Sequence, residues 1–433
     1  MQPTVPVWSL IPFVLMLLAI AVFPLIKATE HWWENNKNKL IVSLVLGIPT
    51  AIFLIDRGLS HDLIHQVVYD YLPFIILLAS LFIVTGGIHL SGDIKATPRN
   101  NTIIMAIGYV LASFMGTTGA AMLLIRPLIS INKERKRKVH TMLFFIAAVA
   151  NCGGLLTPLG DPPLFMLYLR GASFGWFFNL LPQWLFAGAM LLLIYFIVDT
   201  INYKKEDPRD IVIDNKNISP LRLQGNINFV LLIGIVLSVA FINEGTIPAM
   251  KDGNIFMKFL REIVLIIISV LSMVLTKHNI RQSNKFTFAP IIEVAYLFLG
   301  IFTTMTPALI YLKANAGNLG LTSPAQFYYA TGVLSSFLDN TPTAIAFHSV
   351  ALGLPIAEGV SVVASIPEIL LKTICTGAVF FGAMTYIGNG PNFMVKAIAE
   401  ENNIKMPDFF AYMYKFSLIV CLPVYILTQL IFL

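Results

Sequence analysis

Ten long apolar segments dominate this sequence and restrict what it can fold into. A helix needs about 20 apolar residues to cross a hydrocarbon core about 30 Å thick. Segments of this kind lie near residues 7–27, 38–55, 71–90, 140–170, 174–200, 226–243, 260–277, 286–313, 366–400 and 409–433. Hydrophobic residues make up 57% of the chain and charged residues only 12%, about half the share usual in soluble proteins. The chain is therefore predicted to be an all-α polytopic membrane protein.

Two further apolar stretches, 102–131 and 325–353, are interrupted halfway by polar residues. The interruptions read GTTG, beginning at Gly116, and DNTP, beginning at Asp339. A helical arm of about 14 residues is only about 21 Å long at a rise of 1.5 Å per residue. Each stretch is thus expected to form a re-entrant helical hairpin, which enters and leaves the membrane on one side.

The basic residues support this count of ten crossings and two hairpins. Most of the 29 Lys and Arg residues fall in loops that the count places on one side, including NKERKRK at 132–138. Lys and Arg concentrate in cytoplasmic loops, so the basic side is predicted to be cytoplasmic and both termini periplasmic or extracellular. The net charge of +6 therefore indicates topology, and no nucleic-acid partner is expected. The three cysteines lack metal-site spacing, and neither a disulfide framework nor zinc is expected.

The two halves of the chain resemble each other. TPLGDPPLFM, beginning at Thr157, aligns with TYIGNGPNFM, beginning at Thr385, and five of the ten positions are identical. SFMGTTGAAM, beginning at Ser113, aligns with SFLDNTPTAI, beginning at Ser336. The sequence thus predicts an inverted repeat of two five-span halves, because an odd number of crossings turns the second half over. Inverted repeats with interrupted helices are typical of alternating-access transporters.

The predicted boundaries follow from this alignment. The first repeat covers 1–203, with the hairpin at 102–131 and a broken helix at 140–170. A polar cytoplasmic linker covers 204–225. The second repeat covers 226–433, with the hairpin at 325–353 and a broken helix at 366–400.

Helix breaks inside a membrane are expected to bind ions. Backbone groups cannot stay bare in hydrocarbon, and each break exposes carbonyls at one helix end and N–H groups at the next. No Lys or Arg lies in a tip or a break, so a cation is the favoured cargo. The candidate ion- or substrate-binding residues are Thr117 and Thr118 in the first tip, Asn151, Thr157 and Asp161 in the first break, Ser336, Asp339, Asn340, Thr341 and Thr343 in the second tip, and Thr385, Asn389 and Asn392 in the second break.

Asp161 and Asp339 are the most informative of these residues. An ionised carboxylate at the bilayer centre is costly and indicates function. Burial favours the protonated form and a bound cation favours the ionised form, so one carboxyl group can carry either a proton or sodium. Asp161, Asp339 and Asn340 are the predicted sodium ligands. The structural alternatives are a helix N-cap for Asp161 and a tip-closing hydrogen bond for Asp339.

Two other polar residues in apolar segments are candidate proton relays. Glu293 lies in APIIEVAYLF and could instead reach the cytoplasmic edge of the membrane. His348 lies in IAFHSVAL and could instead be a hydrogen-bonded interior histidine.

The tip and break motifs resemble those of NhaD-type sodium/proton antiporters. ANCGGLLTPLGDPPLFMLYLRG, from Ala150 to Gly171, is similar to the broken helix of that family, and SSFLDNTPTAIA, from Ser335, is similar to its second hairpin. These antiporters belong to the ion transporter superfamily, with citrate carriers and divalent-anion/sodium symporters. The resemblance implies a homodimer with an elevator-like motion, in which sodium or lithium exchanges for protons. It also implies ion-site roles for the residues Asn151, Asp161, Asp339 and Asn340. The first tip departs from the family pattern, because Gly116 stands where an acid or amide is usual.

The predicted function is therefore sodium (or lithium)/proton exchange across a bacterial inner membrane, with no cofactor beyond the sodium ion itself. The alternative is sodium-coupled symport of citrate, a dicarboxylate or another small anion, with the anion on helix N-termini. A channel is a further alternative. An enzyme is not expected, because the sequence has no nucleophile–base or metal motif such as His-Glu-x-x-His or Gly-x-Ser-x-Gly.

Overall fold

The computed structural model describes residues 5–24 and 26–433, and most of them are helical. The first half contains η1 (Val7–Leu10), α1 (Ile11–Val22), α2 (Lys27–Glu34), α3 (Asn36–Asp56), α4 (Ser60–Ile64), η2 (His65–Tyr71), α5 (Leu72–Thr85), β1 (His89–Asp93), α6 (Pro98–Met115), α7 (Thr117–Ile131), α8 (Val139–Ala148), η3 (Cys152–Leu156), α9 (Pro162–Leu169), η4 (Phe174–Leu180) and α10 (Leu181–Tyr203). The labels η mark short 3₁₀- or π-helical segments.

The rest of the chain continues in the same style. It contains α11 (Pro208–Lys216), β2 (Ser219–Gln224), α12 (Ile227–Phe241), α13 (Ala249–Asp252), α14 (Ile255–Lys258), α15 (Leu260–Leu275), α16 (His278–Ser283), α17 (Ala289–Ala314), η5 (Ala316–Leu319), α18 (Pro324–Phe337), α19 (Asn340–Leu352), β3 (Val362–Val363), β4 (Ile366–Pro367), α20 (Glu368–Phe381), η6 (Gly382–Met384), α21 (Gly390–Glu401), α22 (Phe409–Tyr412), η7 (Met413–Cys421) and α23 (Leu422–Phe432). Proline occupies the first turn of α6, α9, α10, α18 and α21, where its missing N–H costs nothing.

The helices confirm a polytopic membrane protein. Six helical runs among the described residues are long and apolar enough to cross a bilayer: Asn36–Asp56, Ser60–Thr85, Val139–Leu156, Phe174–Tyr203, Ala289–Ala314 and Phe409–Phe432. The number is seven if Val7–Val22 and Lys27–Glu34 are taken together as one bent span.

Five of the ten predicted spans are not single long helices, among them 140–170, which is divided into α8, η3 and α9. The segment 7–27 is divided between α1 and the start of α2. Residue 25 of this segment lies outside the described residues. So do residues 1–4, which belong to the predicted first repeat and to the N-terminus that was predicted to face outward. The segments 226–243 and 260–277 form α12 and α15, with 15 and 16 residues. At 1.5 Å per residue these two helices are about 22–24 Å long, which is shorter than the hydrocarbon core. The segment 366–400 is broken between α20 and α21.

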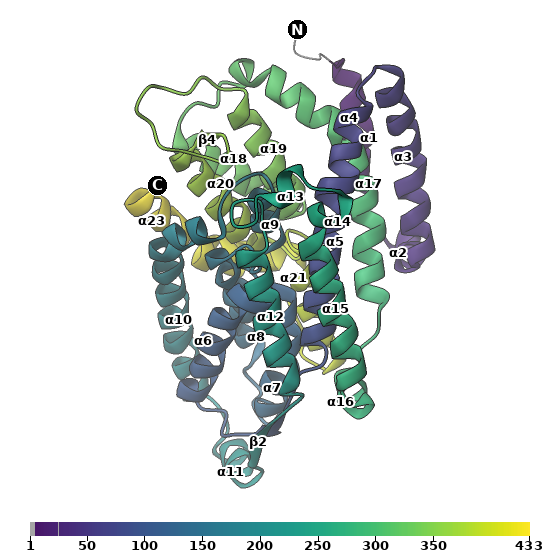
Figure 1. The fold of residues 1–433 in the computed structure, drawn as a ribbon. Coiled ribbons are helices and arrows are strands. Elements are labelled where there is room, and N and C mark those ends of the chain that lie inside the picture. The colour runs from purple at the N-terminus through teal and green to yellow at the C-terminus, as the bar shows by residue number, and fades with distance from the viewer. Residues whose placement is uncertain (1–4, 25) are drawn as a thin grey trace.

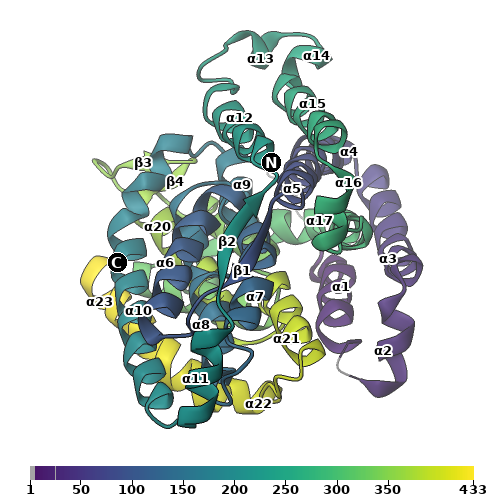
Figure 2. The same cartoon turned by 90° about the horizontal axis from the view of Figure 1, so that it is seen from below.

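The helices form two groups that pack against each other. Figures 1 and 2 show α1, α3 and α17 together on one side of the molecule and α10 with α23 on the opposite side. Within the first group, α17 packs on α3 and α1, and α15 packs on α5 and α12. Within the second group, α6 packs on α7 and η3, and α18 packs on α20. The two groups meet where α19 packs on α17 and where α5 packs on α7 and α9.

Both stretches predicted as hairpins are pairs of helices that meet at a polar turn. α6 and α7 meet at Gly116, whose φ of +81° requires glycine. α18 and α19 meet at Leu338 and Asp339. That each pair re-enters the membrane, and that the halves are inverted, stay predictions.

Two small β-ribbons accompany the helices. β1 pairs antiparallel with β2, with Leu90 opposite Leu223, and β3 pairs with β4. Figure 2 shows the first ribbon running across the lower face beside α11. The segment predicted as a polar linker, 204–225, therefore holds a helix and a strand and is attached to the body of the protein.

Candidate functional site

Asp161 lies at the centre of the segments that interrupt the helices. It is 1% exposed and is the N-cap of α9. Its Oδ1 accepts hydrogen bonds from the hydroxyl of Thr117 (2.9 Å) and from Nδ2 of Asn389 (3.3 Å), and its Oδ2 accepts one from Nδ2 of Asn340. Thr117 begins α7, Asn340 begins α19 and Asn389 precedes α21. Both tips and both breaks thus reach one carboxylate.

A chain of amides extends the site beyond Asp161. Nδ2 of Asn389 also donates to Oδ1 of Asn151 (3.1 Å), and Nδ2 of Asn151 donates to Oδ1 of Asn392 (2.7 Å). Nδ2 of Asn392 in turn donates to the backbone carbonyls of Gly382 (2.7 Å) and Thr385 (2.9 Å). All three asparagines are at most 4% exposed. This chain satisfies carbonyls that the second break would otherwise leave bare inside the membrane.

Two threonines fix the two breaks in the same way. The hydroxyl of Thr157 donates to the carbonyl of Ser113 at the end of α6, and the hydroxyl of Thr385 donates to the carbonyl of Ser336 at the end of α18. The backbone torsions match as well: φ and ψ are −140° and 161° at Thr157, and −138° and 168° at Thr385. Each threonine therefore ties its break to the hairpin of its own half of the chain.

Glycines let the backbones of each break come together. A Cβ on Gly160 would lie 2.0 Å from the carbonyl oxygen of Gly154, and a Cβ on Gly388 would lie 2.6 Å from that of Gly382. The N–H of Thr117 donates to the carbonyl of Gly160 at 2.9 Å, so the first tip rests directly on the first break.

The remaining predicted residues of the tips do not contact Asp161. Oδ1 of Asp339, which is partly exposed, accepts a hydrogen bond from the N–H of Thr341 (2.9 Å), and its carbonyl accepts one from the hydroxyl of Thr343 (2.9 Å). Asp339 is thus the N-cap of α19, and its hydrogen bond to the N–H of Thr341 fits the structural alternative of a tip-closing hydrogen bond. The hydroxyl of Ser336 bonds within α18, and Thr118 is exposed. No hydrogen bond joins Asp339 to Asp161 within the described part of the chain, and a role for Asp339 as a second sodium ligand stays a prediction.

The two candidate proton relays lie apart from the site. Glu293 is in the first turns of α17, where Oε1 is 2.6 Å from Nζ of Lys39 and the side chain is 42% exposed. His348 is 1% exposed, and its Nε2 is 2.9 Å from the carbonyl of Ala364. His348 is nine residues beyond Asp339, about 14 Å along α19. Neither side chain forms a hydrogen bond or ion pair with Asp161 or its partners within the described residues. The contact of His348 with Ala364 fits the alternative of a hydrogen-bonded interior histidine, whereas the alternative for Glu293, the cytoplasmic edge of the membrane, stays a prediction.

The site offers oxygen ligands but only one acidic group. No group of three or more His, Cys, Asp or Glu side chains that could hold a metal ion occurs within the described part of the chain. What surrounds Asp161 is a hydroxyl and amides, which are hard and neutral ligands suited to an alkali cation.

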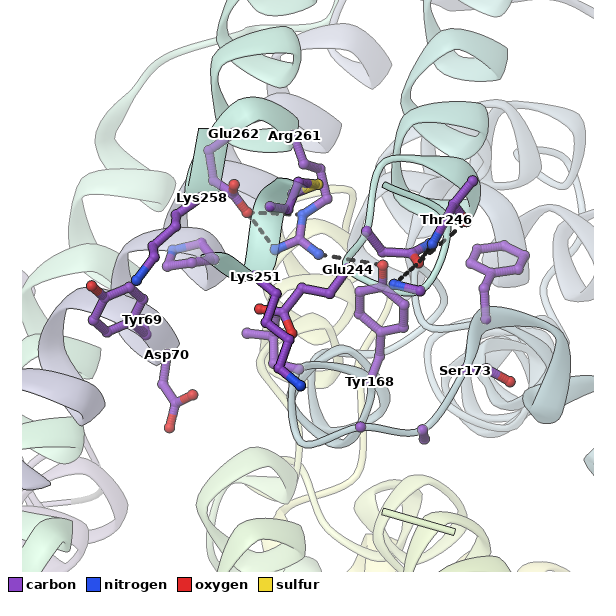
Figure 3. A pocket seen from close by; sticks show the side chains of 18 of the residues that line it. Tyr69, Asp70, Tyr168, Ser173, Glu244, Thr246, Lys251, Lys258, Arg261 and Glu262 are labelled. Atoms are coloured by element: carbon purple, nitrogen blue, oxygen red, sulfur yellow. Dashed lines mark hydrogen bonds and ion pairs between the residues drawn. The ribbon is translucent and has the colours of Figure 1, made fainter. Parts of the chain in front are cut away.

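A large cavity that the sequence analysis did not predict lies away from Asp161. It has a volume of about 820 Å³ and lies between η2, the end of α9 and the segment from α12 to α15. Figure 3 shows Asp70, Tyr168, Arg261 and Glu262 on its walls. Figure 1 places α13 and α14, which follow the short helix α12, well below the upper ends of α3 and α17.

A second polar cluster was also missed. Asp199 near the end of α10 is fully buried, with Oδ1 2.6 Å from Nη2 of Arg135 and 2.7 Å from Nε2 of His140. Asn101 donates to its Oδ2 at 3.2 Å and also pairs with Asn132. The cluster joins the ends of α6, α7, α8 and α10. The sequence signal for this cluster is Asp199, a charged residue at the end of the apolar segment 174–200.

Comparisons with known proteins now identify the class. The sequence profile of a family of membrane transporters described as "Putative citrate transport" matches residues 2–433. The chain belongs to this family. A segment of 132 residues is also 32% identical to inner membrane protein YbiR of Escherichia coli (strain K12), covering 28% of this chain and 35% of that protein. Membership of the family makes the chain a membrane transporter, and the narrower antiporter resemblance stays a prediction.

Proposed function

We propose that this transporter exchanges sodium or lithium for protons at Asp161 by an elevator-like alternating access. One observation carries the proposal: a single buried carboxylate lies where both tips and both breaks converge, and all its side-chain partners are neutral. A carboxyl group in this position is stable either in its protonated, neutral form or in its ionised form with a bound cation. The two cargoes therefore compete for one group, and competition is sufficient for exchange.

The neighbouring side chains can serve both states. In the structure Thr117, Asn340 and Asn389 direct hydrogen-bond donors at the carboxylate. Each amide carries an oxygen as well as an NH₂ group. Rotation of the two amides about χ2 would replace donors by carbonyl oxygens. With the hydroxyl oxygen of Thr117 these carbonyl oxygens would complete an oxygen shell for a sodium ion, which is the transported substrate.

The alternative is sodium-coupled transport of citrate or another small carboxylate, and the description of the family favours it. An anion would use the N–H groups at the starts of the half-helices. α9 offers few of these, because Pro162 and Pro163 occupy its first two positions and have no N–H. No positively charged side chain bonds to Asp161 among the described residues. These features favour the cation exchanger.

The experiment uses purified protein in liposomes with an acidic interior and a pH-sensitive dye. Addition of sodium or lithium, but not potassium, is expected to collapse the pH gradient. Sodium-dependent uptake of labelled citrate or succinate without proton exchange would contradict the proposal and establish the alternative. The homodimer and the inner-membrane location that the resemblance implies are proposals too, tested by the mass of the detergent-solubilised protein and by membrane fractionation.

A further inference from the structure

The two ends of α9 contact different parts of the molecule. Asp161 occupies the N-cap position of α9, and its side chain bonds to residues of the tips and the second break. Its C-terminal residues Tyr168 and Arg170 bond instead to η2, α12 and α15, which contribute nothing to the surroundings of Asp161. Asp161 and Arg170 are nine residues apart, about 14 Å along the helix. A constraint at one end of so short a helix fixes the position of the other end.

Arg170 makes the first of these contacts. Its Nη2 lies 3.0 Å from Oδ2 of Asp70 and 3.3 Å from Oε1 of Gln66, both on η2. Asp70 and Gln66 are 2% and 5% exposed. Asp70 is buried and the Arg170 side chain is only 17% exposed, so removal of Arg170 leaves a buried charge without its partner, which is more costly than the loss of a surface pair.

Tyr168 makes the second contact. Its hydroxyl donates to the carbonyl of Val239 on α12 (2.8 Å) and accepts a hydrogen bond from Nη1 of Arg261 on α15 (3.3 Å). The guanidinium of Arg261 also lies 5.5 Å from the ring centroids of Phe165 and Tyr168, and Glu262 holds it in place through Oε1, 2.8 Å from Nε. Thus α9 is fixed to both neighbouring helices.

These contacts lie at the large cavity. Asp70, Tyr168, Arg261 and Glu262 all line it, and Figure 3 shows Arg261 between Glu262 and Tyr168. Water or solutes in the cavity therefore reach the groups that hold α9.

We propose that the pairs Arg170–Asp70 and Tyr168–Arg261 form a clamp at the cavity that, in the conformation of the structure, positions α9 and, through it, the carboxylate of Asp161. An elevator-like motion would have to release this clamp. The four residues are positioning residues, because none contacts Asp161. The transport part of the inference rests on the proposed sodium/proton exchange, whereas the anchoring of α9 can be tested without it.

The first test compares Asp70→Asn and Arg170→Gln with the wild type in liposomes. Displacement of Asp161 is expected to raise the KM for sodium about 10-fold, with a smaller effect on kcat. Asp62→Asn is the matched control, because Asp62 lies on the adjoining α4, does not line the cavity and forms no ion pair within the described chain. The exchanged pair Asp70→Arg with Arg170→Asp restores the opposite charges and is expected to recover most of the sodium affinity.

The second test uses hydrogen exchange measured by mass spectrometry. Amides of 164–171 are expected to exchange about 10-fold faster in Asp70→Asn, while those of α6 are unchanged. A KM within about two-fold of the wild type in both single variants, together with unaltered exchange in α9, would overturn the clamp. If the wild type moves no protons with sodium, the proposed function fails, but faster exchange in α9 would still establish the anchoring.

Discussion

Asn389 occupies the position in the second half of the chain that Asp161 occupies in the first, and it donates a hydrogen bond to that aspartate at 3.3 Å. Their backbone torsions match, with φ and ψ of −143° and 140° at Asp161 and −151° and 140° at Asn389. Two equivalent turns thus face each other with one acidic side chain between them. The difference between carboxylate and amide gives the site a single titratable group at this point.

Replacing Asn389 by alanine tests whether its amide serves the carboxylate. The change removes a donor to Asp161 and another to Asn151, so we expect the KM for sodium to rise about 10-fold. Asn402→Ala is the control, because Asn402 lies at the exposed end of α21 and its Nδ2 bonds only to Ile398 of the same helix. Equal KM values for the two variants would exclude the role of Asn389.

Substitution by alanine is expected to have opposite effects on stability and transport at two glycines of the second break. A Cβ at Gly388 would lie 2.6 Å from the carbonyl oxygen of Gly382 and 2.8 Å from that of Ser335, whereas a Cβ at Gly390 meets nothing within 4 Å. Gly388→Ala is therefore expected to cost roughly 1–3 kcal/mol or more through overpacking and to stop transport. Gly390→Ala, at the start of α21, is expected to retain both stability and transport. Thermal unfolding in detergent measures stability, and the pH-gradient assay measures transport. Equal thermal midpoints and equal transport rates for the two variants would show that the backbone at Gly388 is not packed as tightly as described.

The paired threonines predict similar losses of stability in the two halves. Thr157→Val and Thr385→Val each leave one buried carbonyl, of Ser113 or Ser336, without its hydroxyl donor. We expect each change to lower the free energy of unfolding by about 1–3 kcal/mol. The exposed Thr118 provides the control, since Thr118→Val removes no buried hydrogen bond. A drop in the thermal midpoint for only one of the two buried variants would contradict an equivalent role for the breaks.

The sequence was most informative where Gly, Pro and polar residues interrupt apolar segments. Such residues are costly inside a membrane, so Thr117, Asn151, Asp161, Asn340, Asn389 and Asn392 could be named before their contacts were known. What the sequence could not supply was the direction of each side chain. Asp339 and Asp161 look alike in composition and context, yet Asp339 caps its own helix and Asp161 meets three other segments.

Features that depend on contacts between distant segments were not predictable. The contact of Arg170 with Asp70 spans 100 residues, and that of Tyr168 with Arg261 spans 93. From the length of their apolar segments, α12 and α15 were predicted to cross the whole membrane. Hydropathy reports the polarity of a segment but not the residue at which its helix ends. The shortness of these two helices, and the cavity beside them, appear only in the assembled structure.

The uptake of radioactive sodium into liposomes with an acidic interior tests the central claim most directly. If Asp161 carries a proton in one direction and sodium in the other, the wild type and Thr118→Val accumulate sodium against its gradient, and Asp161→Asn does not. The account also predicts that Asp161→Asn folds and inserts normally, as shown by its thermal midpoint, because an amide can occupy the same space. Proton-driven sodium uptake by Asp161→Asn at the wild-type rate would contradict it.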